Sequence, residues 1–258
     1  MITTIQHGPV CELRLSRPPV NALSPDLIAA LTESVRSAPK QGARAIVLSG
    51  TPGRFSGGLD LPLLLTLDRA GMAELLHGLY GLLGTLACSP IPIVAAITGH
   101  APAGGTVLTL FCDWRIVAEG DWKLGVNEVA VGLTLPPVLH QALALIVGRR
   151  QAERLAVTAV LIGPAEAARI GLVDEVVPAP EVVPRAIGQC QTFLALPPQT
   201  MSETRSEARK DLTALFAKSF DKEIDELLTM WWRPETQTAL RAILEQLSNR
   251  KQSSAARL

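Results

Sequence analysis

Two glycine-rich turns constrain the fold of this chain more than any other feature. Each follows an apolar stretch: residues 54–60 (RFSGGLD) come soon after residues 44–49, and residues 99–105 (GHAPAGG) begin two positions after a second stretch at 91–97. Short apolar runs bounded by glycine are typical of buried strands, and glycine lets a ligand approach the backbone closely. Two such turns can direct two backbone N–H groups toward one point, where they stabilise a negative charge developing on an oxygen.

A single carboxylate, Glu128, follows the two turns. It lies in the sequence GVNEVAVGL, residues 125–133. A carboxylate beside a pair of N–H donors can remove a proton from the carbon next to a carbonyl group. The combination predicts chemistry that passes through an enolate. The alternative is that Glu128 is an ordinary surface carboxylate at the end of a strand.

The composition favours a globular protein of one large domain, or one domain with a helical appendage. The chain has 258 residues, of which 48% are hydrophobic and 19% charged, and its formal net charge is zero. This balance supports a substantial core and argues against disorder. So few charges leave apolar surface to be covered, which favours oligomerisation. No basic stripe is present, so nucleic-acid binding is disfavoured.

The cysteines and the N-terminal residues indicate a cytoplasmic protein. Cys11, Cys88, Cys112 and Cys190 lie far apart and form no CxxC pair, so we expect reduced core residues and no metal site. The first residues have no signal-peptide pattern, although a processed organellar protein would look the same. The longest apolar helical stretch, residues 135–147, is too short to cross a membrane.

The order of predicted elements suits a coil of ββα turns followed by a helical tail. Alternation in residues 10–16 predicts a half-buried strand, and Ser24 before Pro25 predicts the start of a helix. Further strands are expected at 44–49, 91–97, 114–118, 122–126 and 173–177, and helices at 62–88, 106–111, 137–147, 149–161, 164–170 and, almost without interruption, from 178 to about 250.

Five segments, in this order along the chain, resemble the crotonase, or enoyl-CoA hydratase/isomerase, superfamily. They are residues 17–23 (RPPVNAL), 55–60 (FSGGLD), 97–105 (ITGHAPAGG), 112–116 (CDWRI) and 165–174 (AEAARIGLVD). The resemblance implies an α/β (α+β) fold with a spiral of ββα turns in residues 1–195. It implies a C-terminal helical region, residues 196–258, that forms a homotrimer or a dimer of trimers. It also implies an acyl-CoA substrate, so that coenzyme A arrives with the substrate and no separate cofactor is expected.

The resemblance also assigns roles to individual residues. The N–H groups of Leu59 and Gly104 correspond to the family's oxyanion hole, and Glu128 to its catalytic carboxylate. An independent reason supports Gly104, since it lies near the start of a predicted helix, where N–H groups are unpaired. An apolar wall around Glu128 would raise its pKa. The predicted substrate contacts are Arg17, Val20, Ala22, Gly57, Gly58, Gly105, Val107, Val131, Leu133 and Leu135.

The number of carboxylates bears on the reaction. Hydratases of the family use two glutamates, which correspond to Val107 and Glu128 here, so only the second is present. A single carboxylate suits a Δ3,Δ2-enoyl-CoA isomerase of fatty acid β-oxidation, and residues 101–105 and 127–136 resemble mitochondrial-type isomerases of this kind. The alternatives are another acyl-CoA enzyme of the family, such as a hydratase, thioesterase or decarboxylase, or a non-catalytic acyl-CoA-binding subunit.

Four other polar residues near these motifs are expected to be structural. Ser56 lacks the Gly-x-Ser-x-Gly elbow of a serine hydrolase. Asp60 is expected to cap a helix, and Asp113 to pair with a backbone or arginine group. His100 is expected to be solvated or hydrogen-bonded within its turn.

Overall fold

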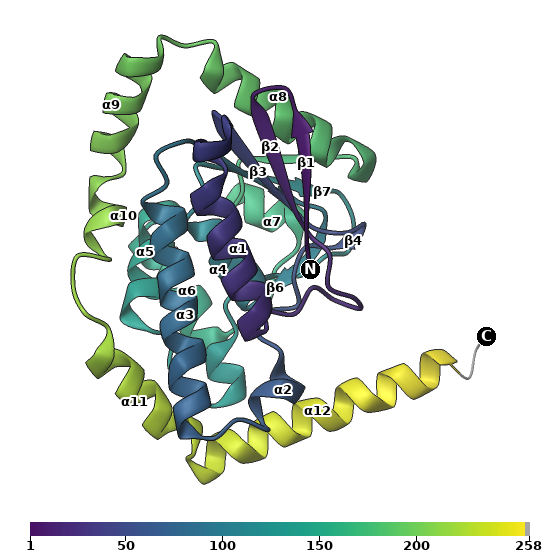
Figure 1. The fold of residues 1–258 in the computed structure, drawn as a ribbon. Helices are drawn as coiled ribbons and strands as arrows, with labels where there is room; N and C mark the ends of the chain where they lie inside the picture. The colour runs from purple at the N-terminus through teal and green to yellow at the C-terminus, as the bar shows by residue number, and fades with distance from the viewer. Residues whose placement is uncertain (256–258) are drawn as a thin grey trace.

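The computed structural model describes residues 1–255, and side chains as far as residue 245. Two sheets form its centre (Figure 1). The six-stranded sheet has the order β1 (Ile2–His7), β2 (Val10–Leu15), β3 (Ala45–Ser49), β5 (Ile93–Ile97), β7 (Trp114–Ala118), β9 (Glu175–Val177). The three-stranded sheet has the order β4 (Gly53–Arg54), β6 (Gly99–Pro102), β8 (Leu124–Gly125). Only β1 and β2 pair antiparallel among the described strands.

The chain winds through three successive ββα turns, as the sequence predicts. Each turn places one strand in the large sheet, the next strand in the small sheet, and then forms a helix. The turns are β3–β4 with α2 (Leu61–Leu64) and α3 (Arg69–Ala87), β5–β6 with α4 (Gly104–Leu110), and β7–β8 with η2 (Glu128–Val131) and α5 (Pro137–Val147). Because β4, β6 and β8 are parallel, the segments that leave them gather at one edge of the small sheet.

The remaining helices surround this spiral. α1 (Pro25–Ser37) begins where predicted, since the Ser24 hydroxyl accepts a hydrogen bond from the N–H of Leu27. The others are η1 (Pro39–Gln41), α6 (Arg149–Thr158), α7 (Pro164–Arg169), η3 (Ala179–Glu181), α8 (Val182–Leu194), α9 (Pro198–Ala208), α10 (Lys210–Ala214), α11 (Asp221–Trp231) and α12 (Pro234–Ala255). Among the described helices, none combines the length and apolar character needed to cross a membrane.

The prediction that β2 is half-buried is wrong, because α8 covers the face that was expected to meet solvent. Val10 and Val47 on that face pack with Val182 of α8. Glu12 shares the face and is only 1% exposed. Burial raises the pKa of its carboxyl, but hydrogen bonds from Ser49, His7 and Arg14 outweigh that effect and hold the pKa below its usual value.

Several elements differ from their predicted positions. β1 was not predicted, and β6 occupies part of the second glycine turn. Gly99 explains the second difference, since a Cβ there would lie 2.1 Å from the carbonyl carbon of Gly53 in the paired strand β4. Helix α4 begins at Gly104, two residues earlier than expected. Cys88 is exposed, which corrects the expectation that all four cysteines are core residues, although all four are free thiols.

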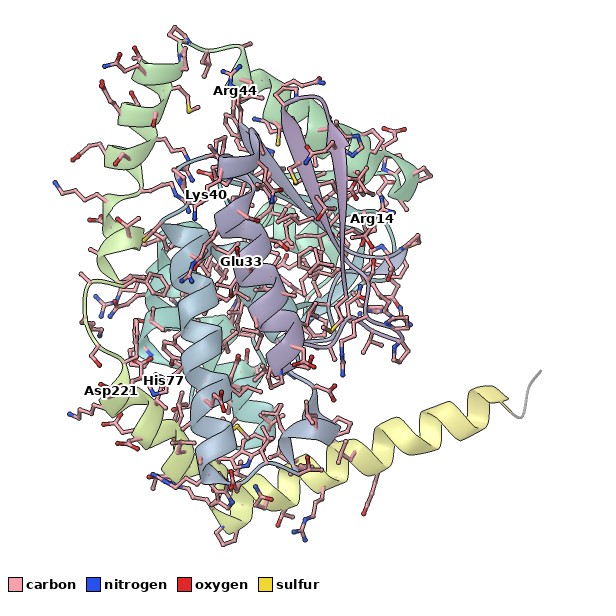
Figure 2. The ribbon with its side chains drawn as sticks, in the orientation of Figure 1. Arg14, Glu33, Lys40, Arg44, His77 and Asp221 are labelled. Carbon is pink, nitrogen blue, oxygen red and sulfur yellow. The ribbon has the colours of Figure 1, made fainter. Side chains whose placement is uncertain are left out.

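The C-terminal helices run along one side of the body, and α12 then projects away from it (Figure 1). α11 packs against α3, where His77 and Asp221 lie side by side with 3.8 Å between Nε2 and Oδ1 (Figure 2). The Tyr80 hydroxyl of α3 donates a hydrogen bond of 2.8 Å to Glu223. The tail is therefore fastened to the spiral by polar as well as apolar contacts.

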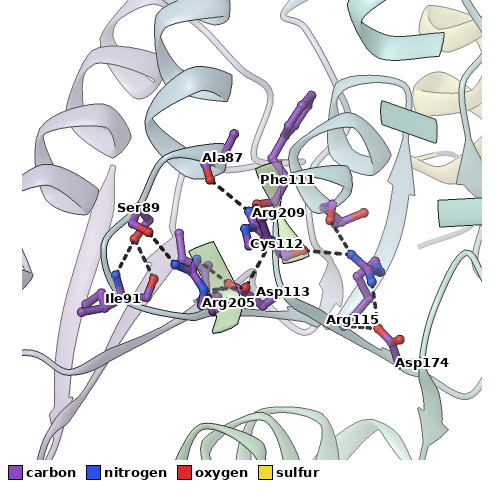
Figure 3. A network of polar contacts seen from close by, with 12 residues as sticks. Ala87, Ser89, Ile91, Phe111, Cys112, Asp113, Arg115, Asp174, Arg205 and Arg209 are labelled. Carbon is purple, nitrogen blue, oxygen red and sulfur yellow. Dashed lines mark hydrogen bonds and ion pairs between the residues drawn. The ribbon is translucent and has the colours of Figure 1, made fainter. Parts of the chain in front are cut away.

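A buried ion-pair network joins α9 to the ends of α3 and α4 (Figure 3). Asp113 accepts two hydrogen bonds from Arg205, at 2.7 and 2.9 Å, and one from the N–H of Ile93, which confirms its predicted structural role. Arg209 pairs with Asp113 at 3.1 Å and donates to the carbonyls of Ala87 and Phe111. These carbonyls lie at helix C-termini, where the dipole favours a positive charge.

Candidate active site

The three predicted catalytic residues occupy equivalent places in the three ββα turns. Leu59 lies between β4 and α2, Gly104 opens α4 after β6, and Glu128 opens η2 after β8. The repeated topology therefore brings them to the same edge of the small sheet, although 69 positions separate the first from the last.

The two glycine turns contact each other backbone to backbone. Gly58 has φ +84°, and a Cβ there would lie 3.0 Å from the Cβ of Ala103 and 3.2 Å from the nitrogen of Gly104. A Cβ on Gly104 would in turn lie 3.2 Å from the Cα of Gly58. Such contacts leave no room for side chains, which explains the glycines. They also place the N–H of Leu59, bonded directly to Gly58, at the junction with Gly104.

The backbone N–H groups of Leu59 and Gly104 have no hydrogen-bond acceptor within the described part of the chain. The N–H groups of Leu23 and Asp60 form the hydrogen bonds on either side of Leu59, to the carbonyls of Gly58 and Leu23. The N–H groups of Leu59 and Gly104 donate no hydrogen bond to any described residue. Ala103, the residue before Gly104, has φ 49° and ψ −123°, a conformation that non-glycine residues rarely adopt. Strain of this kind costs about 1–3 kcal/mol and is concentrated at functional sites.

The segment that leads to Glu128 is tied to the second glycine turn through Gly125. The N–H of Gly125 donates to the hydroxyl of Thr106 at 2.8 Å, and its carbonyl accepts a bond of the same length from the N–H of Ala103. Thr106 lies in the first turn of α4. The hydrogen bonds of Gly125, three residues before Glu128, therefore fix the position of Glu128 relative to Gly104.

The Glu128 carboxylate is isolated from other polar side chains. Its Oε2 atom is buried and has no hydrogen-bond partner among the described residues. Burial raises the pKa of Glu128, opposed only by hydrogen bonds with the backbone at Glu128 and Asn127. Buried polar atoms without partners are rare in folded proteins, and a carboxyl with a raised pKa is typical of a site that transfers protons.

The predicted apolar residues near Glu128 are placed consistently with a hydrophobic wall. Val107 is 2% exposed and lies in α4, one turn after Gly104. Val131, Leu133 and Leu135 are partly buried and pack against the main core. Gly105 has a packing role, since a Cβ there would lie 2.5 Å from the carbonyl oxygen of Ser56.

The predicted contacts in residues 17–22 border the first glycine turn, and Arg17 also fastens it. Arg17 pairs with Asp60 at 2.6 Å and donates to the carbonyl of Ala22 at 3.1 Å. Asp60 caps α2 by accepting from the N–H of Leu63, as predicted. The N–H of exposed Gly57 donates to the carbonyl of Val20. The sequence did not predict that Arg17 reaches the residue next to Leu59.

Sequence reasoning missed Asn21, which organises the same turn. Its side chain is buried and donates to the carbonyls of Arg54 and Phe55, while its own φ is 52°. Asparagine tolerates such positive φ values, and this is the one signal that the sequence carried. Ser56 donates to the carbonyl of Asn21 and accepts from the N–H of Gly58, so it too serves the turn.

Other candidate features lie outside this site. His100 accepts a hydrogen bond from the N–H of Lys123, in agreement with its expected structural role. A cavity of about 820 Å³ lies between α1, α3 and residues 216–221, and none of Leu59, Gly104 and Glu128 lines it. In the described part of the chain, no group of three or more histidine, cysteine or acidic residues is arranged to hold a metal ion.

Known proteins share both the sequence pattern and the fold. The enoyl-CoA hydratase/isomerase family model matches residues 5–251. The mitochondrial enoyl-CoA delta isomerase 1 of mouse is 32% identical over 250 residues, covering 95% of this chain and 86% of its own length. The human protein of that name is 31% identical over 245 residues, covering 94% and 81%.

Solved structures agree with the sequence comparisons. The crystal structure of human mitochondrial delta3-delta2-enoyl-CoA isomerase superposes with a TM-score of 0.91 at 29% identity, covering 97% of this chain and 99% of that one. An enoyl-CoA hydratase from Mycobacterium ulcerans superposes with a TM-score of 0.80 at the same identity, covering 89% and 99%. The chain therefore belongs to the enoyl-CoA hydratase/isomerase, or crotonase, family of enzymes.

Proposed function

We propose that this protein is a Δ3,Δ2-enoyl-CoA isomerase that converts 3-enoyl-CoA to trans-2-enoyl-CoA in fatty acid β-oxidation. The observation that carries the proposal is one half-buried carboxylate, Glu128, whose buried Oε2 atom has no partner among the described residues, in a site where Val107 stands in place of the second glutamate of the family's hydratases. The mouse and human relatives, whose names describe enoyl-CoA delta isomerases, support it.

The proposed mechanism needs only groups that the site contains. The Glu128 carboxylate removes a proton from C2 of the substrate, and the electrons move into the thioester to form a dienolate. The N–H groups of Leu59 and Gly104 donate to the thioester oxygen, where the negative charge develops. Glu128 then returns its proton to C4, which leaves the double bond between C2 and C3. Coenzyme A enters and leaves as part of the substrate.

The test is turnover of a trans-3-enoyl-CoA, followed by the absorbance of the conjugated thioester, with hydration of a trans-2-enoyl-CoA measured in parallel. An isomerase produces the conjugated product and adds little water to it. Dominant hydration would mean that a second group activates water, and the enzyme would then be a hydratase, as the Mycobacterium ulcerans neighbour is named. Tight acyl-CoA binding without either reaction would favour a thioesterase, a decarboxylase or a non-catalytic binding subunit.

The oxyanion hole is tested by Gly104→Ala. The added Cβ would lie 3.2 Å from the Cα of Gly58 and 2.9 Å from a methyl group of Leu23, so Leu23 must shift and the two glycine turns must move apart by a few tenths of an ångström. We expect kcat to fall about 10²–10³-fold, as for loss of one oxyanion-hole donor. Steady-state kinetics would measure it. Gly81→Ala is the control, because no heavy atom beyond its chain neighbours and the backbone of α3 itself lies within 4 Å of its Cβ position.

The assembly and location of the protein remain proposals as well. We propose that residues 196–258 mediate a homotrimer or dimer of trimers, and light scattering on the purified protein would measure its mass. The predicted cytoplasmic location is tested by fractionation, since the mouse and human relatives are named as mitochondrial.

A further inference from the structure

Helix α12 contacts both halves of the candidate site. α12 contacts η2, which carries Glu128, and it also contacts α2, which begins two residues after Leu59. Resting on the proposed function, we propose that Thr236 in the first turn of α12 is a positioning residue that holds Glu128 in place for proton transfer.

Thr236 is closely fitted to the loop that follows η2. Its side chain is fully buried, and its hydroxyl donates a hydrogen bond of 2.8 Å to the carbonyl of Gly132. Gly132 has φ +75°, and a Cβ there would lie 2.9 Å from the Cα of Thr236. The glycine thus serves both the turn and the close approach of the helix.

A single peptide group connects Thr236 to Glu128. The carbonyl of Gly132 accepts from Thr236, and the N–H of the same peptide, which belongs to Leu133, donates to the carbonyl of Glu128 at 3.0 Å. Hydrogen bonds at the two ends of one peptide polarise each other and strengthen the chain. The hydroxyl of Thr236 therefore fixes the backbone of η2 at the residue whose side chain is the proposed base.

This backbone connection matters because no polar side chain among the described residues orients the carboxylate, whose hydrogen bonds come from the backbone at Glu128 and Asn127. Glu128 Oε2 has no partner among the described residues, so no side-chain hydrogen bond restrains it there. Proton transfer requires placement to within about 0.5 Å, and a displacement of about 1 Å can cost on the order of 10²-fold in rate. Restraint therefore reaches Glu128 through its main chain: the bonds at Gly125 act on the segment before Glu128, and the bond from Thr236 acts on the segment after it.

The experiment compares Thr236→Val, which keeps the shape and removes the hydroxyl, with Thr236→Ser, which keeps the hydroxyl. We expect the valine variant to lose about 10- to 100-fold in kcat with little change in KM, and the serine variant to retain most of the activity. Thr238→Val is the matched control, since Thr238 is exposed on the same helix and bonds only to the carbonyl of Pro234.

A second readout does not depend on turnover. NMR titration of the Glu128 carboxyl, assigned by its absence in Glu128→Gln, should show its pKa falling toward the ordinary value in Thr236→Val, because a loosened η2 admits water. An unchanged titration together with unchanged kcat would overturn the inference. So would an equal loss in the valine and serine variants, which indicates a packing role.

The two readouts also separate this inference from the function on which it rests. If the wild-type protein does not isomerise 3-enoyl-CoA but Thr236→Val still shifts the titration, the proposed reaction is wrong and the positioning role stands. If the wild type isomerises and Thr236→Val matches it in both readouts, the reaction stands and the positioning role fails.

Discussion

Glu128→Gln is expected to lower kcat for isomerisation by about 10²–10⁴-fold, because glutamine keeps the shape of the side chain but cannot accept the C2 proton. Binding of a saturated acyl-CoA should change little, since the N–H groups of Leu59 and Gly104 and the apolar wall remain. Steady-state kinetics and calorimetric titration with the saturated ligand would measure the two effects. Glu181→Gln, which removes one exposed carboxylate, is the control.

The pH dependence of the wild-type enzyme follows from the burial of Glu128. The carboxylate is the active form, so kcat/KM should rise with pH as Glu128 loses its proton. Burial raises the pKa of this group, so the rise should lie at higher pH than for an exposed glutamate. A profile that is flat across and above the ordinary range of a glutamate would contradict the assignment, as would comparable kcat in Glu128→Gln.

The raised pKa of Glu128 also predicts that rising pH, which increases kcat/KM, lowers the stability of the fold. A carboxyl with a raised folded-state pKa stabilises the fold only while it is protonated, and that contribution is lost as pH rises through the folded-state value. At neutral pH the charged, half-buried Glu128 therefore opposes folding. Glu128→Gln should raise the midpoint of unfolding at neutral pH, and the gain should vanish in acid below the ordinary pKa of glutamate.

Asp113→Asn is expected to lower the free energy of unfolding by about 3–5 kcal/mol, the usual result of removing one partner from a buried ion pair. Arg205 and Arg209 both pair with Asp113, and their side chains are only 14% and 12% exposed. Asparagine keeps one neutral acceptor oxygen but removes the negative charge, so two buried guanidinium groups lose their counter-charge and otherwise have backbone carbonyls as partners.

Urea denaturation at fixed protein concentration would measure this loss, since oligomer stability depends on concentration. Glu207→Gln is the control, because its pair with Lys210 is exposed and should contribute little. An unfolding free energy for Asp113→Asn within about 1 kcal/mol of the wild type would show that α9 is held by its apolar contacts instead.

Local features of the fold were predictable because their causes are local. Ser24 and Asp60 cap the helices that follow them, and a cap needs only a side-chain oxygen and the next turn of backbone. The spiral of ββα turns followed from the order of apolar runs and glycines. The strand predicted at 122–126 corresponds to β8, which ends three residues before Glu128.

The features that were missed depend on partners far along the chain. The second face of β2 is buried by α8, whose first residue lies 172 positions after Val10, and nothing in the alternation of β2 records that helix. Asp113 was expected to have a structural partner, but its arginine comes from a helix 92 positions away. Likewise Thr236 carries no motif, and its role is visible only where α12 meets Gly132.

The strand order has a consequence for how the protein forms during synthesis. In the large sheet the strands stand in the order in which they are made, so each can pair with one already in place as the chain emerges at about 5–20 residues per second. The residues of the candidate active site are synthesised at widely separated times. Leu59 and Gly104 are both synthesised within the first half of the chain, whereas the bond from Thr236 to Gly132 can form only after the start of α12 has been translated. The strands of both sheets are therefore synthesised well before Thr236, the residue proposed to position Glu128.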